Sequence, residues 1–223
     1  MSQAVYQNLK DECATRNVTL VAVSKTKPAE AIRELYDLGQ RDFGENYVQE
    51  LAEKESFLPK DIQWHFIGHL QSNKVKMIAP FVHLIHAVDS FKLMQEIEKQ
   101  AAKNNRIIDV LLQLHVATEE TKYGMDENEL MTCLEYYTAQ RESFTHVRIR
   151  GIMGMASFTE NEEQVRSELQ QIHTAFVQMK QGYFIGKSYF DTCSMGMSGD
   201  YKIAIEEGST MIRIGSMLFG ERN

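Results

Sequence analysis

Eight short runs of apolar, often β-branched residues alternate with amphipathic stretches along this chain of 223 residues. This alternation limits the fold more than any other feature of the sequence. The predicted strands cover residues 19–25, 41–45, 63–68, 83–88, 109–116, 148–155, 189–193 and 211–216. A helical stretch is expected after each strand except the last, and one more before the first strand. Strands joined through helices run parallel, so the sequence predicts an α/β fold.

Helix boundary signals support this interpretation. The helices with the clearest signals are expected at 28–38, 90–104, 126–141, 159–181 and 197–207. Pro28 lies in the first turn of its helix, where its missing N–H costs nothing, and Gly39 follows the last turn. Acidic and hydroxyl residues precede other helices as caps, and Gly182 and Gly208 follow two of them.

Two closures of a parallel sheet fit this order: a doubly wound open sheet and a (β/α)₈ barrel. Eight strands in a chain of this length favour the barrel. The first strand is not followed by the Gly-rich fingerprint of dinucleotide-binding sheets. With only three prolines and no low-complexity linker, we expect one domain over residues 1–223.

Composition excludes several classes of function. A formal net charge of -7 gives no footprint for nucleic acid or an anionic membrane surface. No apolar run is long enough to span a membrane, and the N-terminus does not resemble a signal peptide. Three widely separated cysteines argue against a disulfide framework and a zinc ribbon. We therefore expect a cytoplasmic protein.

The first predicted strand ends in a lysine with a possible chemical role. In the segment AVSKTKP, strand alternation puts Val21, Val23 and Lys25 on one face. If that face lines a barrel, the amine of Lys25 points into its mouth. An amine in a partly apolar mouth loses its charge more readily, as a Schiff-base lysine requires. A surface lysine at a strand end is the simpler alternative.

The last predicted strand carries Arg213 between two isoleucines. A buried arginine needs a carboxylate, a phosphate or a ring acceptor, and an ion pair between strands would satisfy it equally well. Small residues follow this strand at Gly215 and Ser216, and the preceding one at 194–199. The loops after strands 7 and 8 form the recurring phosphate site of the barrel fold.

Other polar residues at strand ends are less specific. Asn46 and His69 are placed to hydrogen-bond a ligand, although loop capping and a rim contact explain them as well. His65 and His69 straddle a strand end, and we expect His83 and His86 on opposite faces of a strand. Zinc ligands must converge, so no metal site is predicted.

In order along the chain, the segments AVSKTKP, DFGENYVQE, WHFIGHLQSNK, RGIMGM, SMGMSGDY and IRIGSMLFG resemble the YggS/PROSC family of pyridoxal phosphate homeostasis proteins. The resemblance runs from about residue 21 to residue 220. It implies the barrel of the N-terminal domain of alanine racemase, with an extra N-terminal helix, and pyridoxal 5′-phosphate as the cofactor.

The resemblance also implies roles for individual residues. Lys25 matches the lysine that forms the internal aldimine, and Arg213 the arginine that faces the pyridine nitrogen. Ser194, Gly215 and Ser216 match phosphate-binding positions, and Asn46 matches a position at the cofactor's edge in such proteins. The family resemblance further suggests that Lys27 and Lys122 affect cofactor exchange, and the basic tail of some relatives is not matched here.

Three functions follow from this set of residues. The leading hypothesis is a binding protein that holds the cofactor, limits its free concentration and passes it to apoenzymes without catalytic turnover. It rests on the cationic partner of the ring nitrogen, which weakens the ring as an electron sink, and on the expectation that the chain lacks a second, substrate-closing domain. The alternatives are an amino-acid racemase, with Tyr47, Tyr123 or Lys27 as the base, and a barrel with a vestigial site. We expect a monomer.

Overall fold

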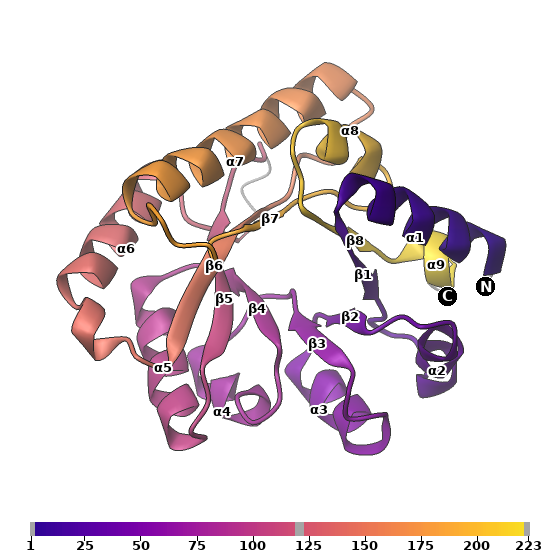
Figure 1. Cartoon of the computed structure of the whole chain (residues 1–223), viewed down its shortest axis with the longest axis horizontal. Helices are drawn as coiled ribbons and strands as arrows, with labels where there is room; N and C mark the ends of the chain where they lie inside the picture. Colours follow the sequence, from indigo (N-terminus) through magenta and orange to yellow (C-terminus); the bar gives the residue numbers. More distant parts are fainter. Residues whose placement is uncertain (1–2, 119–122, 221–223) are drawn as a thin grey trace.

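The computed structural model contains a closed barrel of eight parallel strands in the order β1 to β8, with helices around the outside (Figure 1). It describes residues 3–118 and 123–220. The strands are β1 Thr19–Val23, β2 Asp42–Glu45, β3 Gln63–Phe66, β4 Leu84–Val88, β5 Ile108–Leu114, β6 Val147–Gly154, β7 Thr192–Ser194 and β8 Met211–Ile214. The barrel closes where β8 pairs in parallel with β1, which confirms the predicted (β/α)₈ fold.

Helices connect every pair of consecutive strands, as expected. They are α1 Gln3–Arg16, α2 Ala29–Asp37, α3 Val48–Phe57, α4 Val75–Ile78, α5 Phe91–Lys103, α6 Glu127–Ala139, α7 Glu162–Gly182, α8 Tyr201–Glu206 and α9 Ser216–Phe219, with short 3-10 turns at η1 Ser72–Lys74 and η2 Arg141–Ser143. The extra N-terminal helix α1 is present and packs beside β1 and α9 (Figure 1). The expectation of no helix after the last strand was wrong, because α9 is one turn and too short to show a helical period.

Two elements begin later in the structure than the sequence predicted. Helix α7 begins at Glu162 rather than at residue 159, because the Asn161 side chain accepts the backbone N–H groups of Glu163 and Gln164. Strand β7 begins three residues late, because Phe190 closes a turn on Lys187 and stacks on Phe184 outside the barrel.

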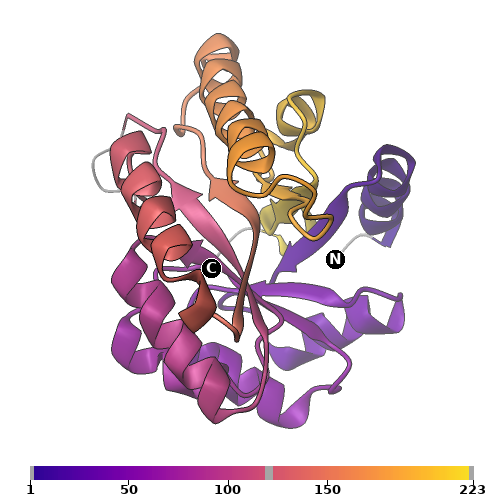
Figure 2. The same cartoon turned by 60° about the vertical axis from the view of Figure 1, so that its left-hand side comes forward.

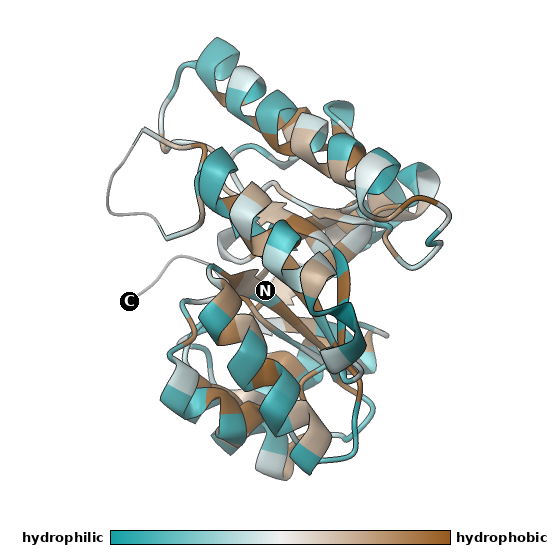
Figure 3. Cartoon of the chain, turned by 90° about the vertical axis from the view of Figure 1, so that its left-hand side faces the viewer, coloured by the Kyte–Doolittle hydropathy of each residue, from teal (hydrophilic) through white to brown (hydrophobic). Residues whose placement is uncertain are grey.

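Two apolar clusters lie within the described part of the chain. The larger lies between the strands and the helices, whose apolar sides face inward in Figure 3, while Figure 2 shows α6 and α7 over β5 and β6. The smaller one comes from β1, β4, β5, β6 and β8 and contains Val21, Leu84, Ala87, Leu111, Met153 and Met211. This second cluster is separate from the larger one and lies inside the barrel, beneath the strand ends where a site is expected; β4 contributes both Leu84 and Ala87 because its register shifts between Ile85 and Val88.

No described helix is both long and apolar enough to cross a bilayer. Within the same residues, no three side chains of His, Cys, Asp or Glu are grouped so as to hold a metal ion. The three cysteines, Cys13, Cys133 and Cys193, are all buried and unpaired.

Candidate functional site

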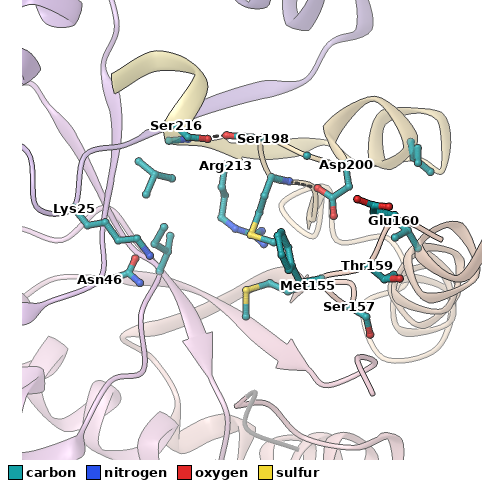
Figure 4. Close-up of a pocket in the computed structure, with 18 of the residues that line it drawn as sticks. Lys25, Asn46, Met155, Ser157, Thr159, Glu160, Ser198, Asp200, Arg213 and Ser216 are labelled. Atoms are coloured by element: carbon teal, nitrogen blue, oxygen red, sulfur yellow. Dashed lines mark hydrogen bonds between the residues drawn. The ribbon is translucent and has the colours of Figure 1, made fainter. Parts of the chain in front are cut away.

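A cavity of about 740 Å³ opens at the carboxyl ends of the strands. Five of the six predicted site residues line it: Lys25, Asn46, Arg213, Gly215 and Ser216 (Figure 4). They come from the ends of β1, β2 and β8. A parallel barrel brings these strand ends together however far apart they are in the sequence. The sixth, Ser194, does not line the cavity.

Lys25 enters the cavity from the turn after β1. The strand ends at Val23, and the partly buried side chain of Lys25 extends toward the region between Asn46 and Arg213 (Figure 4). Lys27 lines the same cavity. Lys122, the other lysine singled out in the sequence, lies outside the described residues.

Arg213 lies at the floor of the cavity, on β8. Its side chain is buried, and its Nη2 donates to the carbonyl oxygen of Gly154 at 3.0 Å. Burial lowers the pKa of Arg213 to about 10, and it is therefore a cation at neutral pH. Its hydrogen bonds in the described part of the chain go to neutral groups, not to the interstrand carboxylate that the sequence also allowed. A buried cation lining the floor of a cavity is suited to a ligand acceptor.

Ser194 connects Arg213 to a polar chain through the barrel. Arg213 Nη1 donates to Ser194 Oγ at 2.6 Å, and Ser194 Oγ lies 3.1 Å from His86 Nδ1. His86 Nε2 is 2.9 Å from His65 Nδ1, and His65 Nε2 is 3.0 Å from Asp42 Oδ1. Asp42 is the first residue of β2, so the chain runs from the cavity to the opposite end of the barrel.

The two ends of this chain fix the direction of every hydrogen bond in it. An arginine only donates and a carboxylate only accepts. With both histidines neutral, Ser194 therefore donates to His86, His86 Nε2–H donates to His65, and His65 Nε2–H donates to Asp42. Burial is the main reason that the pKa of His86 lies well below its ordinary value, which agrees with a neutral ring.

This arrangement bears on the role predicted for Ser194. The side chain is fully buried, and the cavity wall does not include it. Its hydroxyl accepts from Arg213 and, with neutral rings, donates to His86, so its one donor and one of its two acceptor positions are used within the protein. Ser194 thus lies behind Arg213, and not beside Gly215 and Ser216.

The loops after β7 and β8 form the upper wall of the cavity. Ser198 and Gly199 line it together with Gly215 and Ser216 (Figure 4). Ser198 Oγ accepts from the Gly215 N–H at 3.4 Å, which joins the two loops. Asp200 Oδ1 accepts from the backbone N–H of Met197 at 2.6 Å and holds the first loop in its turn. Backbone N–H groups in turns of small residues are a typical anion cradle.

Asn46 follows β2 and contributes an unsatisfied acceptor. Its Oδ1 is buried and has no hydrogen-bond partner in the described part of the chain. Gly68 explains the tight fit of this region, since a Cβ there would lie 2.3 Å from the Asn46 carbonyl oxygen. A buried acceptor without a partner, at the edge of a cavity, is a position for a ligand donor.

His69 is not part of the cavity wall. Its Nδ1 lies 3.1 Å from Asp89 Oδ2, and its ring stacks on that of Tyr123 at 4.0 Å. Of the two interpretations that the sequence allowed, the hydrogen-bonded rim histidine is the observed one.

The contacts among His65, His83 and His86 were not predicted from the sequence. Both His83 and His86 contact His65, with ring centroids 5.4 and 5.1 Å apart, although strand alternation predicted opposite faces. That prediction was wrong because His83 lies in a bend before β4, where alternation does not apply. The loop at 155–160 also lines the cavity, and no pattern in its sequence indicated this.

The closed eight-stranded barrel of this chain has counterparts among known proteins. A family model described as the N-terminal domain of alanine racemase matches residues 2–223. Alanine racemase from Bartonella henselae has the same fold, with a TM-score of 0.70 at 20% identity over 98% of this chain and 58% of that one.

Sequence similarity narrows the class further. A pyridoxal phosphate homeostasis protein from Aquifex aeolicus is 42% identical over 91% of this chain and 86% of its own. One from Escherichia coli K12 is 38% identical over 92% of this chain and 86% of its own. The chain belongs to the family of pyridoxal phosphate homeostasis proteins.

A solved structure supports the same assignment. PipY of Synechococcus elongatus PCC7942, in its form without PLP, superposes with a TM-score of 0.88 at 34% identity over 97% of this chain and 99% of its own. The form of PipY with PLP bound has a TM-score of 0.82, again at 34% identity.

Proposed function

We propose that this protein binds pyridoxal 5′-phosphate as a Schiff base on Lys25 and acts in cofactor homeostasis without catalytic turnover. The observation that carries the proposal is the convergence of Lys25 and the buried Arg213 on one cavity. The neutral amine of Lys25 condenses with the cofactor's aldehyde, forming a C=N bond and releasing one water molecule. PLP bound to PipY and the names of the curated relatives support the choice of cofactor.

The other cavity residues fit the remaining parts of this cofactor. Arg213 is a donor for the pyridine nitrogen, and the loops with Ser198, Gly199, Gly215 and Ser216 are the cradle for the phosphate. Asn46 supplies the buried acceptor at the ring's edge. We assign Ser194 to holding Arg213 instead of the phosphate, because its hydroxyl is engaged below the cavity floor.

The absence of turnover in the proposal follows from the charge of Arg213. When bound, the cofactor supplies an electron sink whose strength depends on protonation of its ring nitrogen. A cationic guanidinium at that nitrogen opposes protonation, so the cavity favours holding the cofactor over activating it. The proposal also includes delivery of the cofactor to PLP-dependent apoenzymes and a monomeric state. It further includes a cytoplasmic location, which the three unpaired cysteines support.

Reduction with borohydride tests the site. The purified protein with added pyridoxal 5′-phosphate should show a visible absorbance band that borohydride bleaches, leaving the reduced adduct on the Lys25 peptide. Lys25→Ala should lose the band, and Lys27→Ala, from the same cavity wall, should keep it. A protein that stays colourless, or an adduct on Lys27, would contradict the Lys25 assignment.

Incubation with amino acids tests the absence of turnover. Steady interconversion of a D- and an L-amino acid that disappears in Lys25→Ala would favour the racemase alternative. The fold that this chain shares with alanine racemases makes this the enzyme class to examine first.

A further inference from the structure

A buried lysine lies directly behind the turn that carries Lys25. Lys54, on α3, is 5% exposed, and its Nζ donates to three oxygens. These are the backbone carbonyl oxygen of Ser24 at 2.8 Å, Glu45 Oε1 at 2.7 Å and Glu50 Oε1 at 2.7 Å. All three donors of the ammonium group are thus occupied, which fixes its position.

The same two carboxylates bind the residues on either side of Lys25. Glu45 Oε1 accepts from the hydroxyl of Ser24 at 2.6 Å, and Glu50 Oε1 accepts from the backbone N–H of Thr26 at 2.6 Å. One cluster therefore anchors the residue before Lys25 through its side chain and its carbonyl oxygen, and the residue after it through its N–H.

Thr26 has a backbone conformation that needs such an anchor. Its φ of 62° lies in the left-handed region, which a β-branched residue rarely adopts. Strained backbone persists where surrounding contacts determine it, and Glu50 supplies such a contact here. Without it, the turn after β1 can relax and carry the Lys25 amine away from the cavity.

Burial makes the cluster depend on Lys54. Glu45 is fully buried, and its second oxygen, Oε2, has no hydrogen-bond partner in the described part of the chain. Burial raises the pKa of this carboxyl, and the charge of Lys54 opposes the rise. Lys54 is the cation that lets both carboxylates remain next to the turn.

We propose that Lys54, with Glu45 and Glu50, is a positioning residue that holds the amine of Lys25 where it reaches the cofactor's aldehyde. This inference rests on the proposed function. It assigns the cluster to formation of the covalent bond, and not to the non-covalent contacts made by Arg213 and the phosphate loops.

Two ligands separate these contributions. Pyridoxal 5′-phosphate can form the Schiff base, whereas pyridoxine 5′-phosphate has an alcohol in place of the aldehyde and binds by the non-covalent contacts alone. A displaced Lys25 amine should therefore weaken binding of pyridoxal 5′-phosphate much more than binding of pyridoxine 5′-phosphate. A general loss of structure would weaken both alike.

The variants are Lys54→Met and Glu50→Ala. Glu50→Ala is the milder change, because it removes the anchor of Thr26 and leaves the Lys54–Glu45 pair intact. Lys60→Met is the matched control, since Lys60 forms an exposed pair with Glu55 at 2.7 Å away from the turn. Measured by absorbance and borohydride trapping, both variants should slow Schiff-base formation by about 10- to 100-fold, as expected for a misplaced reacting group.

Each outcome decides the inference. Support requires that affinity for pyridoxine 5′-phosphate stays within about twofold of wild type while covalent attachment falls. Equal weakening of both ligands, or unchanged attachment in Glu50→Ala, overturns the positioning role. If the wild-type protein forms no adduct on Lys25, the proposed function fails and the inference fails with it.

Discussion

Arg213 Nη1 and Ser194 Oγ lie 2.6 Å apart beneath the cavity, and this contact couples the cavity floor to the opposite end of the barrel. Because Asp42 only accepts, the bonds between neutral rings all point toward it, and Ser194 therefore donates its O–H to His86. A chain of aligned hydrogen bonds polarises its members and restrains their rotation. Arg213 is thus held as a donor for whatever occupies the cavity.

Ser194→Ala tests whether this residue acts through Arg213. The change leaves a buried guanidinium N–H without its acceptor, which should lower the free energy of unfolding by about 1–3 kcal/mol. Urea denaturation of the ligand-free protein measures this loss. Binding of pyridoxal and of pyridoxal 5′-phosphate should weaken by similar factors, because both ligands contact Arg213. Weakening confined to the phosphorylated ligand would instead assign Ser194 to the phosphate.

The sequence was sufficient to predict the barrel and a group of residues that line one cavity. Strand alternation placed Val21 and Lys25 on one face, and the observed inner cluster contains Val21. Strand ends meet at one rim in this fold, so five residues predicted one by one line a single cavity. Such local and topological rules need no knowledge of side-chain packing.

The polar support behind the site was not predictable in the same way. Lys54 lies on a helix whose sequence resembles an ordinary charged surface stretch, and only its contacts with Glu45 of β2 and with the turn after β1 bury it. The polar chain through the barrel, from Arg213 to Asp42, depends on the register between β2, β3 and β4. This register brings His65 between Asp42 and His86. Such side-chain contacts between strands follow from the geometry of the barrel and cannot be predicted from the sequence of any single strand.

A second prediction concerns acid stability. The folded protein keeps His86 neutral, since its pKa is well below the ordinary value, whereas the unfolded chain binds a proton there near pH 6.5. The contribution of a neutral His86 to the free energy of unfolding is therefore complete above about pH 6.5. It falls as the pH drops below this value, by up to about 1.4 kcal/mol per pH unit.

His86→Gln should flatten this dependence, because the neutral amide keeps one donor and one acceptor and does not titrate. Urea denaturation at several values between pH 7.5 and pH 5 measures the slope for both proteins. His173→Gln, on α7 outside the barrel, is the control for the substitution itself. An identical acid slope in wild type and His86→Gln would mean that other groups cause it.

Asn46→Ala separates a ligand contact from a structural one. The Asn46 Oδ1 has no partner in the described residues, so its removal should leave the free energy of unfolding of the ligand-free protein nearly unchanged. Affinity for pyridoxal 5′-phosphate should fall by the value of one hydrogen bond, about 0.5–1.5 kcal/mol. Calorimetric titration and urea denaturation on the same preparation test both halves. Loss of stability with unchanged affinity would place Asn46 in the framework instead.

Gly68→Ala tests how closely the β3 end approaches Asn46. The added Cβ would meet the Asn46 carbonyl oxygen at 2.3 Å, and because backbone cannot give way as a flexible side chain can, residue 46 must move. We expect a loss of about 1–3 kcal/mol in the free energy of unfolding, typical of overpacking, with weaker cofactor binding.

Gly182→Ala is the matched control, since nothing lies within 4 Å of its added Cβ at the end of α7. Its stability should equal or exceed wild type, because alanine is the better helix former. Equal stability of the two variants would show that the turn holding Asn46 yields freely, and that its position is set by the ligand and not by Gly68.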